Sequence, residues 1–70
     1  RPIQEVTFNL KSTKELDELS KYLPKQGNTL IKIYISDNKN DLKFHLKKKR
    51  NIDRKTINIL RNKEISAIIG

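Results

Sequence analysis

The strongest chemical signal in the sequence is a run of basic side chains in its second half. Residues 43–55 include seven positively charged side chains and one negatively charged side chain, so this segment has a net charge of +6, out of +8 for the whole chain. Such a cluster can bind phosphates or an acidic protein surface, and lysines at a sheet edge also discourage aggregation. The predicted partner-binding residues are Lys47, Lys48, Lys49, Arg50 and Arg54.

A second set of residues would serve a nucleic-acid partner. Alternation along two expected strands places these side chains on one exposed sheet face, namely Lys32, Tyr34, Lys43 and His45. Cations there could contact phosphates without reading base sequence. Only one aromatic accompanies them, whereas RNA-recognition modules with the same element order stack bases on several. Weak, non-specific DNA contact is therefore the alternative to a protein partner.

The acidic residues predict no catalytic or metal site. Glu15, Asp17 and Glu18 begin an expected helix, where carboxylates interact favourably with the helix dipole. Asp37 and Asp41 have the spacing of a calcium loop, but the obligatory glycine and the final glutamate are missing. We read that segment as a hairpin turn.

His45 is the only side chain that normally titrates near neutrality, and it lies between Lys43 and Lys47 with no carboxylate or nucleophile nearby in sequence. Two glycines are too few for a phosphate-binding loop. We therefore expect no catalytic residue, no metal and no cofactor within these residues.

Length and composition indicate one domain over residues 1–70. The chain has no cysteine, which excludes disulfides and thiolate metal sites, and it has no apolar run long enough to span a membrane. We expect a cytoplasmic monomer. The absence of methionine suggests a fragment of a longer chain, and the abundance of Lys, Ile and Asn is also typical of AT-rich codon usage, so the origin of the basic charge stays open.

Hydrophobic periodicity predicts six elements in the order βαββαβ. Alternation indicates strands over residues 5–10, 30–35, 42–46 and 65–69. Ser12 fits the start of a helix with a capping box completed by Glu15, ending near Tyr22 or Leu23, and Asp53 can cap a second helix. Between the first helix and the second strand, Gly27 and Asn28 form a turn suited to positive φ.

This order predicts an α/β (α+β) two-layer sandwich, with the ferredoxin-like split βαβ as the leading topology. Both helices would then cover one face of a four-stranded sheet. The side chains expected beneath them are Val6, Phe8, Ile31, Ile33, Leu42 and Phe44, and those on the open face are Thr7, Asn9, Lys32, Tyr34, Lys43 and His45.

Several segments together resemble a known domain. The stretch from Gly27 to Ile35, the polar turn, the alternating residues 42–46 and the basic run into Ile52 are similar to the C-terminal domain of the bacterial DNA polymerase III alpha subunit. The likeness covers nearly the whole chain. Asn62 and Lys63 stand where that family has a glycine near the end of the second helix, and Lys49 stands where an aromatic is common.

The resemblance implies a non-catalytic module of a replicative polymerase. Its partner would be the clamp-loader tau subunit, which such a module docks to hold the polymerase in the replisome. The nucleotidyltransferase site of the parent chain would then lie upstream of these residues.

Overall fold

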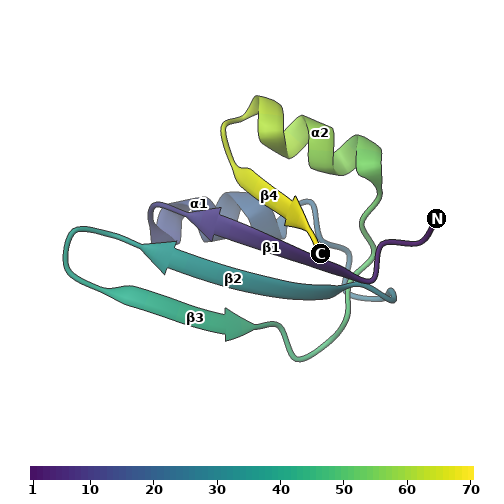
Figure 1. Cartoon of the computed structure of the whole chain (residues 1–70), viewed down its shortest axis with the longest axis horizontal. Helices are drawn as coiled ribbons and strands as arrows, with labels where there is room; N and C mark the ends of the chain where they lie inside the picture. Colours follow the sequence, from purple (N-terminus) through teal and green to yellow (C-terminus); the bar gives the residue numbers. More distant parts are fainter.

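The chain forms a four-stranded mixed sheet with two helices packed on one of its faces (Figure 1). The computed structural model describes all residues from 1 to 70. The strands are β1 (Glu5–Leu10), β2 (Leu30–Ser36), β3 (Asp41–His45) and β4 (Ser66–Ile69), and the helices are α1 (Thr13–Ser20) and α2 (Arg54–Asn62). The element order βαββαβ and the α+β sandwich expected from the sequence are both present.

The strand order is β3-β2-β1-β4, so the prediction of a split βαβ topology is wrong. A ferredoxin-like sheet would place β3 between β1 and β2. Here β1 pairs directly with β2 in parallel, with Val6 opposite Ile31 and Phe8 opposite Ile33. The β2–β3 hairpin therefore extends the sheet on the far side of β2, and β4 takes the other edge of β1 in antiparallel register.

One hydrophobic core joins the sheet to both helices. Val6, Phe8 and Ile33 are fully buried on the inner sheet face. Leu19 from α1 and Leu60 from α2 are equally buried and belong to the same cluster. Complete burial of one such side chain contributes about 2 to 3 kcal/mol, so the core of fourteen residues is what holds the helices to the sheet.

The inner side of β3 departs from the sequence prediction. Leu42 and Phe44 lie opposite Ile35 and Ile33, which places them on the core side of the sheet as expected. They are nevertheless 49% and 38% exposed, because α1 lies behind β1 and α2 lies beside β4, so neither helix reaches β3 (Figure 1). The expectation that these two residues pack under the helices is therefore wrong.

Both helices begin with the predicted caps. The Ser12 hydroxyl accepts a hydrogen bond from the Glu15 backbone N–H, and the Asp53 carboxylate accepts one from Thr56. The Glu15 side chain reaches back to the N–H of Lys11 at 2.6 Å instead of that of Ser12. Helix α1 ends at Ser20, slightly earlier than predicted.

The end of α2 is a Schellman motif, although no glycine is present. The N–H of Ile65 donates to the carbonyl of Leu60, and the N–H of Glu64 donates to that of Arg61. Glu64 adopts a φ of 65°, the left-handed conformation that favours glycine. The position at the end of α2 that would suit a glycine is therefore Glu64, and not Asn62 or Lys63.

Gly27 does not have the positive φ for which glycine is usually required, and neither does any other glycine in the chain. It is needed here because a side chain would not fit. A Cβ atom on Gly27 would lie 2.2 Å from the carbonyl carbon of Arg50 and 2.3 Å from the backbone nitrogen of Asn51. The adjacent Thr29 forms a two-bond bridge with Arg50. Close contact between two backbone segments therefore fixes the loop that follows β3 against the loop that precedes β2.

Candidate functional site: a basic loop beside an open sheet edge

The structure divides the predicted basic cluster into free and internally bonded side chains. We use the name basic loop for Lys47, Lys48 and Lys49, which follow β3 and are all exposed. The ion pairs of the molecule join Lys21 to Glu18 and Lys32 to Glu5, so none of the three lysines is neutralised by a carboxylate. The basic loop therefore presents three unpaired positive charges to solvent.

Arg50 has a structural role in addition to its charge. Its guanidinium donates from Nη1 to the carbonyl of Leu23 at 2.9 Å and from Nε to the carbonyl of Lys48 at 3.3 Å. Its backbone N–H and carbonyl bond to Thr29 at 2.8 and 2.9 Å. Arg50 thus anchors the basic loop to the loop that follows α1, which leaves fewer of its donors for a partner.

Arg54 is also engaged within the chain. Its Nη1 donates to the carbonyl of Arg1 at 2.7 Å, tying the start of α2 to the N-terminal residues. Of the five residues predicted to bind a partner, only the three lysines of the basic loop are unengaged. The sequence could not distinguish them, because all five are long basic side chains in one run.

The residues of the nucleic-acid alternative come together on the open sheet face. The β2–β3 register places Lys32 opposite His45 and Tyr34 opposite Lys43. The Lys43 ammonium lies 5.1 Å from the centroid of the Tyr34 ring, within the range of a cation–π interaction. Lys32 lies 3.2 Å from the Glu5 carboxylate, so part of its charge is offset.

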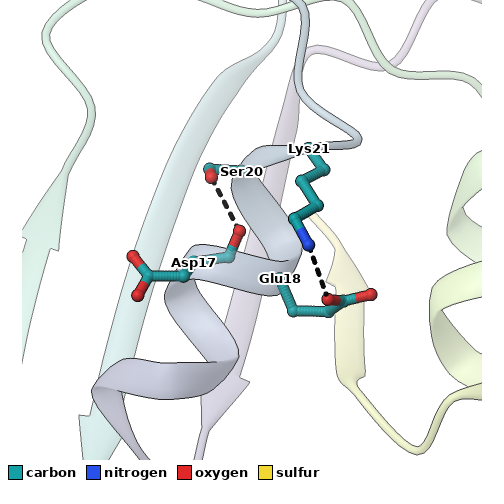
Figure 2. A network of polar contacts seen from close by, with 4 residues as sticks. All are labelled: Asp17, Glu18, Ser20 and Lys21. Carbon is teal, nitrogen blue, oxygen red and sulfur yellow. Dashed lines mark hydrogen bonds and ion pairs between the residues drawn. The ribbon is translucent and has the colours of Figure 1, made fainter.

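Acidic side chains on α1 make only local contacts (Figure 2). The Ser20 hydroxyl donates to the backbone carbonyl of Asp17 at 2.8 Å, and the Lys21 ammonium lies 3.4 Å from the Glu18 carboxylate. The Asp17 carboxylate points away from both contacts in Figure 2. These groups do not converge on a common point.

The β2–β3 turn has its own carboxylate. Asp37 Oδ1 accepts hydrogen bonds from the backbone N–H groups of Lys39 at 2.8 Å and Asn40 at 2.7 Å. The bond from Lys39, followed by that from Asn40, holds the pKa of Asp37 below its usual value. The predicted hairpin turn is confirmed, and no group of three or more metal-ligating side chains is present.

No helix has the length and apolar character needed to cross a membrane. The candidate site consists of two features that are consecutive in the chain, at one edge of the sheet. One is the basic loop, and the other is β3, whose five residues are all exposed.

Comparison with protein-family models, curated proteins and solved structures finds no match for this chain.

The exposure of the β3 edge could not be predicted from the sequence. The alternation of residues 42–46 is compatible with either a covered or an uncovered strand. Deciding between them requires the positions of both helices, and these follow from the strand order.

Proposed function

We propose that this chain is a non-catalytic C-terminal module of a bacterial replicative DNA polymerase alpha subunit, which docks the clamp-loader tau subunit. The resemblance of residues 27–52 to that domain supplies the identity of the partner. Nucleotidyl transfer would belong to the parent chain, and the module would tether the polymerase within the replisome.

The observation that carries this proposal is that one strand, β3, has the exposed apolar side chains Leu42 and Phe44 and leads directly into the basic loop. Protein interfaces combine an apolar centre with a polar or charged rim, whereas a surface for nucleic-acid backbone contact needs charge alone. Exposed apolar side chains on a strand that leads into three lysines without ion pairs fit a protein surface that combines apolar and acidic residues.

The direct test is a titration of the 70-residue chain against the tau subunit by calorimetry. A variant with Lys47, Lys48 and Lys49 changed to Glu should bind about tenfold or more weakly, since each rim charge contributes a few tenths to one kcal/mol. Arg50 is left unchanged, because its guanidinium supports the fold.

The matched control reverses three other exposed lysines, Lys14, Lys25 and Lys63. This control has the same net charge as the variant of the basic loop, and it should bind tau with an affinity within about twofold of the parent's. If the parent chain does not bind tau, the proposed function is wrong. Equal weakening in both triple variants would show that net charge, not the basic loop, accounts for binding.

Sequence-independent nucleic-acid binding is a second candidate, favoured by the register that groups Lys32, Tyr34, Lys43 and His45 on the open face. The cations that would neutralise phosphates are Lys43, Lys47, Lys48, Lys49 and Arg50. If they neutralise about four phosphates, the logarithm of duplex affinity should fall with the logarithm of salt concentration at a slope of about −4. The absence of binding at low salt would reject this candidate.

A further inference from the structure

The outer edge of β3 has backbone groups that no strand pairs. In an antiparallel ladder, residues alternate between bonding to the neighbouring strand and pointing away from it. The Leu46 N–H donates to the Ile31 carbonyl at 3.0 Å, which sets the phase of this alternation. Leu42 and Phe44 therefore bond toward β2, and the N–H and carbonyl groups of Asp41, Lys43 and His45 point outward.

The opposite edge of the sheet is protected in a way that β3 is not. The Gly70 N–H donates to the Glu5 carbonyl, which by the same alternation directs the backbone groups of Ala67 away from β1. The Arg61 guanidinium donates to the Ala67 carbonyl from Nη2 at 2.7 Å and from Nε at 3.2 Å. An arginine thus occupies the β4 edge, while no side chain bonds to the outward groups of Lys43 and His45.

A strand added to β3 would also cover apolar surface. Leu42 and Phe44 face the core side of the sheet and are about half and two-fifths exposed. Alternate side chains of an added strand would lie beside them on that face. The edge therefore offers both unpaired hydrogen-bonding groups and an apolar strip, which is the combination used in β-strand addition.

The charges near the β3 edge determine which kind of segment could be added as a strand. The other side of β3 presents Asp41, Lys43 and His45, and the three lysines of the basic loop follow at its end, so the positive charge increases toward the loop. A second copy of this chain paired through β3 would bring two such clusters together, each part of a domain with a charge of +8, which is unfavourable. A segment with acidic side chains at the same positions would be attracted instead.

We propose that β3 accepts an extended segment of a partner protein as a fifth strand, and that this segment alternates apolar with acidic residues. The apolar residues cover Leu42 and Phe44, and the acidic residues lie beside Lys43 and toward the basic loop. The identity of the partner rests on the proposed function, under which the tau subunit would supply the segment. The binding site itself is defined by the β3 edge alone.

The first experiment uses a short synthetic peptide in which glutamate alternates with valine, and amide hydrogen exchange of the chain is followed by NMR. In the free chain the outward N–H groups of Lys43 and His45 should exchange rapidly, and those of Leu42 and Phe44 slowly. Saturating peptide should slow exchange at Lys43 and His45 by about tenfold or more. A peptide of identical composition with its glutamates and valines in two separate blocks should produce no such protection.

Two changes test whether the backbone edge itself is bound. Lys43→Pro removes an outward N–H, a substitution that edge strands tolerate on their solvent side, and Lys43→Thr removes the same charge but keeps the N–H. The proline variant should bind the alternating peptide about tenfold more weakly than the threonine variant. Should Lys43→Pro fail to fold, a peptide N-methylated at alternate residues tests the same bonds against the parent chain and should lose binding to a similar extent.

These results separate the binding mode from the identity of the partner. Protection of Lys43 and His45 by the peptide, without tau binding, supports the edge site and rejects the polymerase assignment. Tau binding that is unaffected by Lys43→Pro relative to Lys43→Thr, together with no protection by the alternating peptide, rejects strand addition and leaves docking in place.

Discussion

Replacement of Arg50 by alanine tests whether this residue belongs to the fold or to the binding surface. The substitution removes the guanidinium bonds to the carbonyls of Leu23 and Lys48 and leaves the backbone bridge to Thr29 intact. The bond to Leu23 is 2.9 Å long and partly buried, whereas that to Lys48 is 3.3 Å long and exposed. The first bond should therefore account for most of the loss.

A hydrogen bond to a charged group contributes about 1.5 to 3 kcal/mol, and the Leu23 carbonyl would lose its partner. The total stability of a small domain is about 5 kcal/mol, so this is a large fraction. For a domain of this size, 1 kcal/mol corresponds to about 4 to 8 °C in Tm, so Arg50→Ala should lower the Tm by about 6 to 24 °C.

Thermal unfolding followed by circular dichroism measures this shift. Lys48→Ala is the matched control, because it removes a neighbouring positive side chain that makes no internal bond, and its Tm should stay within about 2 °C of the parent. Arg50→Lys should be intermediate, since one ammonium cannot reproduce the fork of donors. A Tm for Arg50→Ala equal to that of Lys48→Ala would refute the structural role.

Three further predictions concern the backbone and the caps. Glu64→Gly should raise stability by about 0.5 to 1 kcal/mol in urea unfolding by relieving the left-handed φ, and Glu64→Ala, which keeps a Cβ, should show no gain. Gly27→Ala should destabilise by about 3 kcal/mol, because its Cβ would collide with backbone atoms of Arg50; a loss below about 1 kcal/mol would contradict this close approach. The N–H of Thr56 lowers the pKa of Asp53 below its ordinary 3.8, so the carboxylate's stabilisation is present above that pH and is lost as the pH falls through the lower folded value. Melts between pH 5 and 2 should show a smaller decline for Asp53→Asn than for the parent, and equal declines would be the contrary result.

Local features of this fold could be predicted from the sequence because they depend on neighbouring residues. Alternation around Phe8 and Ile33 gave the correct inner face, and Ser12 and Asp53 gave both helix starts. Strand order could not be obtained this way, since the same alternation satisfies both the split arrangement and the observed direct pairing of β1 with β2.

The residues of the candidate site could be predicted from the sequence, but which of them are free to bind a partner could not. The sequence identified the basic run, yet the internal bonds of Arg50 and Arg54 depend on carbonyls far away in the chain, at Leu23 and Arg1. The exposure of Phe44 likewise depends on where the two helices lie and not on its own neighbours. Contacts between residues distant in the sequence therefore determine which side chains of the basic run hold the fold together and which remain free to bind a partner.

The pairing of β1 with β4 has a consequence for synthesis of the protein on the ribosome. Strand β1 lies in the middle of the sheet, but one of its two neighbours is made from residues 66–69. Phe8 and Ala67 can meet only after nearly all of these residues have left the exit tunnel. Until then one edge of the central strand has no neighbour, and such edges promote association between nascent chains. Pairing of β4 with β1, together with the bonds from Arg61 to the Ala67 carbonyl, would then cover this edge.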